Sequence, residues 1–233
     1  ARMEAEDIVC KFIDFGIEQA LAGTHKTPNF LLGPIGGISF KVTAGTEKTV
    51  RIALGYFRDG DVVFNRSASY WYTQYFDSIE SVFSYALKHY DDFSDIVQKA
   101  DNDLLSYGLS EDQQFLIAHA TRSYYGSTEW LVEDGKPLWI VNEGEYLMIN
   151  TLDLTIDMAF FELNFNPWTL KNVLEYFVDH YSYEDQVFSP EDPNTLLDGG
   201  VSFTHDMGVG NHFSPDKYSC YECAGIDRKC FSY

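Results

Sequence analysis

Apolar and polar residues alternate with a period of two in the first quarter of the chain. The pattern predicts strands over Gly36–Val42 and Thr49–Phe57, and the residues between them have turn composition, so we expect a hairpin. A shorter apolar run, Val62–Phe64, follows a further turn. Before these strands, residues 3–22 space their apolar positions as a helix or an irregular buried segment would. Because two or three strands do not form a stable sheet alone, we interpret them as the end of a larger sheet.

After Arg66 the period changes to 3.6 residues, which predicts successive helices. Ser110 and Gln113 have the spacing of a capping box, and Pro167 fits the first turn of a helix. The expected helices are Ser69–Tyr90, Asp91–Leu105 (or a continuation of the first after a kink), one that follows Ser110, Thr151–Leu163 and Pro167–Tyr181. Residues 188–200 and 205–233 have the composition of long loops. Long loops that carry polar and aromatic residues suggest a helical barrel with a site at one mouth.

The stretch from Lys136 to Asp153 places acids between two apolar runs. Glu143 and Glu145 flank a single glycine, and both neighbouring segments have buried character. Burial can shift the pKa of such carboxyl groups and suit them to chemistry, because desolvation disfavours the charged form. The alternative is a helix N-terminus at which either acid satisfies free backbone N–H groups.

Charge limits the possible partners. The chain has 233 residues with 36 acidic and 16 basic side chains, a formal charge of −20. This field repels phosphate backbones and anionic membrane surfaces, so we expect neither nucleic acid nor membrane as a partner. No apolar run approaches the length of a membrane span. The chain begins at Ala1 and stops at Tyr233 without a polar tail, and we interpret it as a piece of a longer protein.

Four cysteines raise the question of a metal or redox site. Cys220 and Cys223 form a CxxC, with Cys230 and His212 nearby in sequence, and Cys10 lies far away. Zinc sites use such ligands, but the second compact ligand pair is missing. A redox pair lacks the surrounding βαβ pattern. We therefore favour structural or incidental thiols.

Three polar clusters could carry chemistry: 142–146, 150–153 and 204–208. Carboxylates, hydroxyl-directed acceptors and flat aromatic faces such as Trp139 make up the mixture that a sugar site needs. Taken singly, His205 could be a hydrogen-bonded loop residue and Asp153 a helix cap. Glu143, Glu145, His205 and Asp206 could hold a divalent ion, but no metal-binding spacing supports this, so we expect no metal. The sequence contains no G-x-S-x-G nucleophile turn of a serine hydrolase.

Several long motifs carry a resemblance to a known family. V-N-E-G-E-Y-L-M-I-N-T-L-D-L-T, F-F-E-L-N-F-N-P-W-T-L-K-N-V-L-E and S-F-T-H-D-M-G-V-G-N resemble glycoside hydrolase family 52, the retaining β-xylosidases, and so does L-S-E-D-Q-Q-F-L-I-A-H-A-T-R-S-Y-Y-G upstream. The resemblance covers nearly the whole chain. It implies a multidomain β-then-α fold, with residues 1–66 the last strands of a β-sandwich plus a linker and residues 67–233 the first helices of an (α/α)6 barrel.

The resemblance also implies roles for single positions. Glu143 matches the catalytic nucleophile. Glu145 is then a neighbour that shapes the site or pairs with a cation, and it is the second choice for the nucleophile. Asp153, His205 and Asp206 fall on motifs that resemble sugar-hydroxyl contacts in the related bile-acid β-glucosidase family, in which the E-G-x-E-Y pattern has one residue more between its glutamates. We add Glu145 and Trp139 to the expected substrate contacts. The family's acid/base aspartate lies in a T-Y-D motif, which these residues do not contain.

The sequence thus predicts a piece of a retaining exo-β-xylosidase acting on small oligosaccharides, with no cofactor. A β-glucosidase and a non-catalytic carbohydrate-binding relative remain alternatives. A homodimer and a cytoplasmic location are working expectations, and the residues themselves decide neither.

Overall fold

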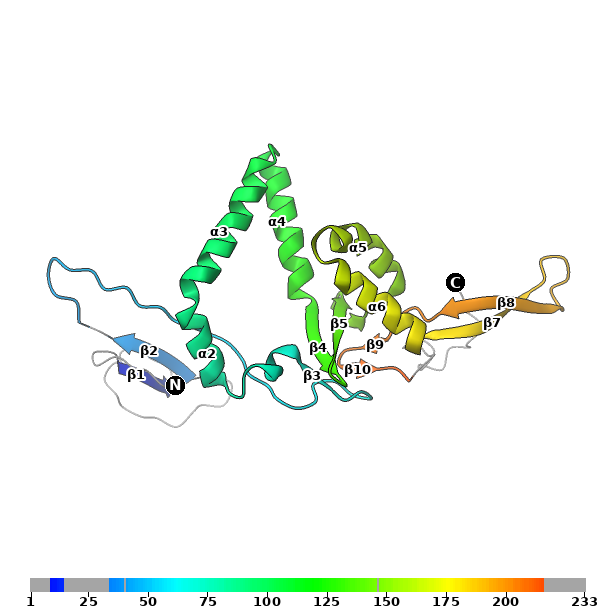
Figure 1. The fold of residues 1–233 in the computed structure, drawn as a ribbon, viewed down its shortest axis with the longest axis horizontal. Coiled ribbons are helices and arrows are strands. Elements are labelled where there is room, and N and C mark those ends of the chain that lie inside the picture. Colours follow the sequence, from blue (N-terminus) through cyan, green and yellow to red (C-terminus); the bar gives the residue numbers. More distant parts are fainter. Residues whose placement is uncertain (1–8, 15–33, 40, 146, 216–233) are drawn as a thin grey trace. The chain divides into compact units, whose positions relative to one another are not determined.

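The computed structural model describes residues 9–14, 34–39, 41–145 and 147–215 (Figure 1). The chain divides into two compact units. The smaller unit contains the described residues up to Gly55 together with 80–89. In it β1 (Val9–Asp14) pairs antiparallel with β2 (Pro34–Ser39), and most of α2 (Ile79–Lys88) belongs to the same unit.

Two predictions for this region are wrong. Residues 9–14 of the expected helical or irregular segment form a strand, and the rest of that segment lies outside the described residues. β2 falls on the predicted first strand, but it pairs with β1, and Thr49–Phe57 has no regular structure. Ile52, Leu54 and Tyr56 are exposed there. Alternation alone therefore did not make a strand, because a strand also needs a partner for its backbone groups.

The larger unit is built on a six-stranded antiparallel sheet with strand order β10-β9-β6-β5-β4-β3. Its central hairpin joins β4 to β5 through Asp134 and Gly135, whose φ angles of 49° and 76° are those of a tight two-residue turn. The strands are β3 (Ala68–Tyr70), β4 (Thr128–Glu133), β5 (Lys136–Glu143), β6 (Met148–Ile149), β9 (Gly208–Val209) and β10 (His212–Phe213).

The helices confirm most of the 3.6-residue pattern. The described residues form η1 (Trp71–Gln74), α2, α3 (Tyr90–Ser106), α4 (Glu111–Gly126), α5 (Leu152–Phe165) and α6 (Pro167–His180) (Figure 1). The capping box at Ser110 is present in both directions, and Pro167 occupies the first turn of α6. The single helix expected over Ser69–Tyr90 is wrong, because Ser69 and Tyr70 pair with β4 and α2 begins only at Ile79.

Residues 188–200 are not a continuous loop as predicted. β7 (Ser182–Phe188) pairs antiparallel with β8 (Leu196–Phe203), which leaves only the turn between them irregular (Figure 1). The chain therefore combines antiparallel strands with helices, and strands recur between and after the helices rather than only before them.

The core of the larger unit lies between the sheet and α6. Leu131, Leu138, Ile140 and Phe177 are buried in one cluster, which fixes the position of β5. All four tryptophans of the sequence also lie in one row: Trp71 stacks on Trp130 at 4.8 Å, Trp130 contacts Trp168 at 5.3 Å, and Trp168 contacts Trp139 edge-on at 5.5 Å between ring centroids. This row joins η1, β4, β5 and α6.

Candidate active site

The acidic turn lies between β5 and β6, as the sequence predicts. Asn142 pairs with Ile149 and Glu143 with Met148, and Gly144 has a φ of 56°, in the left-handed region that glycine adopts without strain. Asn142 and Ile149 are buried, whereas Glu143 and Glu145 are exposed. The alternative of a helix N-terminus is wrong, because this turn closes a hairpin.

Glu143 borders a cavity of about 610 Å³ between α4, α5 and the end of β5. Its walls are mainly apolar, including Ile117, Leu154, Met158, Phe161 and Phe165. Asn142, Asp157 and the ring of Tyr124 also line it. A carboxylate beside an apolar cavity can contact the polar edge of a ligand whose other parts are sequestered from water.

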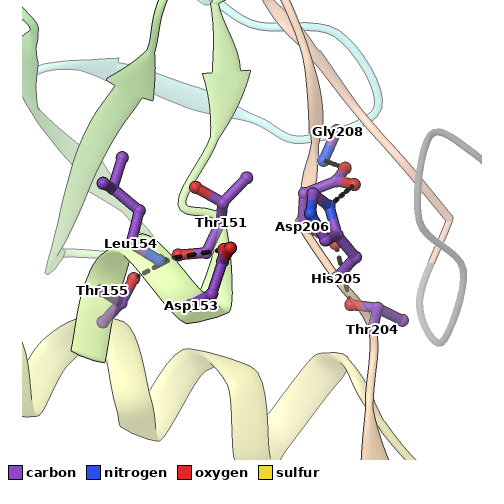
Figure 2. Close-up of polar contacts among 8 residues, drawn as sticks. All are labelled: Thr151, Asp153, Leu154, Thr155, Thr204, His205, Asp206 and Gly208. Atoms are coloured by element: carbon purple, nitrogen blue, oxygen red, sulfur yellow. Dashed lines mark hydrogen bonds and ion pairs between the residues drawn. The ribbon is translucent and has the colours of Figure 1, made fainter. Parts of the chain in front are cut away.

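The second cluster starts α5 (Figure 2). Thr151 is the N-terminal cap residue by position, and it is buried. Asp153 lies in the first turn and is exposed, and its Oδ1 accepts a hydrogen bond from the backbone N–H of Leu154 at 2.9 Å. The carboxylate is thus placed where the helix dipole favours negative charge.

The third cluster pairs a buried aspartate with a half-buried histidine (Figure 2). Asp206 is 0% exposed, and its Oδ1 accepts from the backbone N–H of Gly208 at 2.8 Å. Its Oδ2 lies 3.0 Å from Nδ1 of His205. Thr204 donates from its hydroxyl to the backbone oxygen of Asp206 at 2.8 Å. These contacts fix the orientation of the imidazole ring, as a carboxylate does for many functional histidines.

Backbone hydrogen bonds bring the second and third clusters together. The N–H of Leu152 donates to the carbonyl oxygen of His205 at 2.8 Å, and the N–H of Met207 donates to that of Ile149 at 2.9 Å. Glu143 is joined to this neighbourhood through β6, which pairs with both β5 and β9. The cavity beside Glu143 is not lined by Asp153, His205 or Asp206.

Trp139 and Glu145 are not among the residues that line that cavity. Trp139 is buried in the tryptophan row, and its indole N–H has no hydrogen-bond acceptor among the described residues. Glu145 is exposed in the turn after Gly144. Tyr146, the last member of the first cluster, lies outside the described residues.

The structure adds a buried acid that the sequence analysis did not single out. Glu162 on α5 is 2% exposed, and Tyr124 on α4 donates to its Oε1 at 2.5 Å. The Thr169 hydroxyl near it instead donates to the carbonyl oxygen of Asn166 at 2.8 Å, which leaves Oε2 without a donor in the described part of the chain. Burial raises the pKa of Glu162, and the same burial together with the adjacent carboxylate raises the pKa of Tyr124. An acid inside the apolar F-F-E-L run was the available signal.

No group of three or more His, Cys, Asp or Glu side chains among the residues that the structure describes is arranged to hold a metal ion. Cys220, Cys223 and Cys230 lie outside the described residues, and His212 stacks on Phe64 with 4.3 Å between ring centroids. Within the same described ranges, no helix combines the length and apolar character needed to cross a membrane.

The chain is similar in sequence to proteins of a known family. The sequence pattern of Glycosyl hydrolase family 52 matches residues 2–233. A β-xylosidase of Geobacillus stearothermophilus is 46% identical over 222 residues, which are 95% of this chain and 31% of that protein. A second β-xylosidase of the same organism is 48% identical over 221 residues, 94% of this chain and 35% of that protein. The chain thus spans about a third of the length of these curated relatives.

Proposed function

Because this chain belongs to Glycosyl hydrolase family 52, we propose that it is part of a retaining exo-β-xylosidase. Such an enzyme releases terminal β-D-xylosyl residues from xylo-oligosaccharides or aryl β-xylosides. The two relatives named β-xylosidase support the choice of sugar, since their identity to this chain extends over nearly all of it. Within the complete protein, the described strands and helices would contribute to a β-sandwich over residues 1–66 and an (α/α)6 barrel from residue 67 onward.

Glu143 is the nucleophile in this proposal. Its carboxylate attacks the anomeric carbon while the bond to the leaving oxygen breaks, and a second carboxyl group gives its proton to that oxygen. A water molecule, deprotonated by the same second group, then cleaves the xylosyl–Glu143 ester. The second group would lie about 5–5.5 Å from Glu143 and would come from a T-Y-D motif outside these residues.

The observation that carries the assignment is the placement of Glu143. It ends a strand whose preceding residues are buried, so its backbone is fixed, while its side chain is exposed at the edge of the cavity. A nucleophile needs this combination of a rigid support and an accessible carboxylate.

The remaining site residues would bind the sugar. Asp206 is fully buried and would act through His205, which it orients, while His205 and the exposed Asp153 would form hydrogen bonds with sugar hydroxyl groups. Glu145 would shape the entrance beside Glu143. Trp139 would stabilise the strand that carries Glu143 through its packing on Trp168.

Azide provides the test of the nucleophile. In the complete enzyme, Glu143→Gly should lower the turnover of an activated aryl β-xyloside on the order of 10⁴-fold. Azide, which is small enough to occupy the space left by the carboxylate, should restore turnover and yield a glycosyl azide of inverted configuration. Glu145→Gly changes the same turn two residues away and serves as the matched variant, whose activity azide should leave unchanged.

Near-wild-type turnover by Glu143→Gly, or no response to azide, would contradict the assignment. Comparing aryl xyloside with aryl glucoside in the unmodified enzyme tests the sugar. Preference for the glucoside would instead favour a β-glucosidase, and no turnover of either would favour a non-catalytic carbohydrate-binding protein.

A further inference from the structure

Along one edge of β5, the strand that ends in Glu143, side chains form hydrogen bonds with backbone groups that no neighbouring strand reaches. β6 is only two residues long and pairs with Asn142 and Glu143, so the earlier backbone groups of β5 need other partners. Asn172 on α6 accepts from the N–H of Trp139 at 2.7 Å and donates to the carbonyl oxygen of Pro137 at 2.8 Å. Asn150 continues this pattern closer to Glu143.

Asn150 makes three hydrogen bonds to β5. Its Oδ1 accepts from the N–H of Val141 at 2.7 Å, and its Nδ2 donates to the carbonyl oxygen of Trp139 at 3.1 Å. Its backbone N–H donates to the carbonyl oxygen of Val141 at 2.9 Å. The side chain therefore replaces a neighbouring strand at the two alternate residues that precede Glu143 on the same face of β5.

Asn150 also contacts the loop that carries the third cluster. Its Nδ2 lies 3.5 Å from Sδ of Met207, the residue immediately after Asp206. Backbone bonds on either side of it, from Met207 to Ile149 and from Leu152 to His205, hold the same loop. The Asn150 side chain thus contacts both β5, the strand that carries Glu143, and the segment that carries His205 and Asp206.

The properties of asparagine fit this position closely. Asn150 is 1% exposed and has a φ of 47°, in the left-handed region that asparagine enters more readily than most residues other than glycine. Its amide carries a donor and an acceptor side by side, as a peptide group does. Removing it would leave a buried N–H and a buried C=O of β5 without these partners, and β5 could then shift to recover them.

We propose that Asn150 is a positioning residue that fixes the Glu143 carboxylate relative to the His205–Asp206 segment. This inference rests on the proposed function. Displacing a reacting group by about 1 Å can cost on the order of 100-fold in rate, so a small movement of β5 should lower kcat more than it changes substrate binding.

Two asparagine variants of the complete enzyme separate positioning from stability. Asn150→Gly keeps the left-handed backbone and removes the side chain, and it should lower kcat about 10- to 100-fold with KM changed less than about threefold. Asn172→Ala removes the same kind of edge bonds at a greater distance from Glu143 and away from the loop. It should lower the unfolding midpoint but leave kcat within about twofold of wild type. Activity is assayed at a temperature well below the unfolding midpoints of both variants.

The azide reaction tells whether Asn150 acts through Glu143. In a Glu143→Gly background, azide replaces the carboxylate, so adding Asn150→Gly should reduce the azide-supported rate less than about threefold. The proposal is overturned if Asn150→Gly leaves kcat near wild type, or lowers the azide-supported rate by the full factor seen with Glu143 present. An active Glu143→Gly enzyme would contradict the proposed function instead, so the two failures are distinguishable.

Discussion

At the scale of single residues, Gly208 shows how closely the backbone segments of the site approach one another. Its φ is 140°, and a Cβ added there would lie 2.1 Å from the carbonyl oxygen of His212 and 2.9 Å from the backbone N of Ser214. Its N–H is also the donor to Asp206. A side chain at this position would therefore force β9 and β10 apart and disturb the buried carboxylate.

We expect Gly208→Ala to lower the free energy of unfolding by about 2–3 kcal/mol, because it adds a clash to an unfavourable backbone angle. Gly210 in the same turn has a φ of 60°, and a methyl group added there would meet no described atom within 4 Å, so Gly210→Ala should cost only about 1 kcal/mol. Urea denaturation of the complete protein measures both. Equal costs would show that the contact with His212 relaxes freely.

At the scale of elements, a hydrogen bond from the half-buried Tyr124 on α4 to the buried Glu162 on α5 joins the two helices. Tyr124 remains protonated because its pKa is raised, so it continues to donate to Glu162. The pKa of Glu162 is raised by burial, so the folded protein binds a proton more tightly than the unfolded chain does. Between the pKa of Glu162 in the unfolded chain and its pKa in the folded protein, the contribution of this group to the free energy of unfolding therefore falls as pH rises.

The pH dependence of unfolding tests this pair. As pH rises from near the ordinary value of 4.5 through the folded pKa of Glu162, wild type should lose about 1.4 kcal/mol for each unit by which that pKa is raised. Glu162→Gln should remove this component. Tyr124→Phe removes the hydrogen-bond donor that favours the ionised form of Glu162, so the pKa of Glu162 should rise further. The pH-dependent loss of unfolding free energy should therefore be larger in this variant than in wild type. Urea midpoints between pH 4 and 8 measure all three, and parallel profiles for wild type and Glu162→Gln would refute the raised pKa.

At the scale of the whole molecule, α5 presents more apolar surface than the described residues cover. Phe160 is 86% exposed, and Ile156 and Leu163 on the same helix are exposed as well. A helix that is apolar on several faces is typical of a buried helix. Since the curated relatives are about three times as long, the proposed barrel would cover this surface in the complete protein.

We therefore expect Phe160→Ser to destabilise the complete protein by about 3 kcal/mol, the usual cost of removing a buried aromatic ring. Glu175, an exposed residue of α6 in a surface ion pair with Lys171, provides the control, and Glu175→Gln should change stability by less than about 0.5 kcal/mol. Thermal or urea unfolding measures both. If Phe160→Ser behaves like the control, this face of α5 is exposed to solvent in the complete protein too.

The correct predictions concern features that depend on residues close in sequence. The capping box at Ser110, the first-turn Pro167 and the turn at Gly144 each depend on a few neighbouring residues, so the sequence alone indicates them. The family motifs extend over such local segments and led to the family that the comparison confirms. The wrong predictions concern strands, whose existence depends on a partner: β2 pairs with β1 rather than with Thr49–Phe57, and Ser69 and Tyr70 pair with the distant β4 instead of starting a helix.

The sequence by itself thus determined the family, most helices and the acid-bearing turn at Glu143. Only the tertiary structure decided which side chains pair between distant segments, because Asn172 and Glu162 reach partners 33 and 38 residues away, Trp139 and Tyr124. Backbone donors and acceptors must be paired when buried, but many side chains could pair them. The fold selects among those candidates by bringing one within hydrogen-bonding distance and excluding water from the rest.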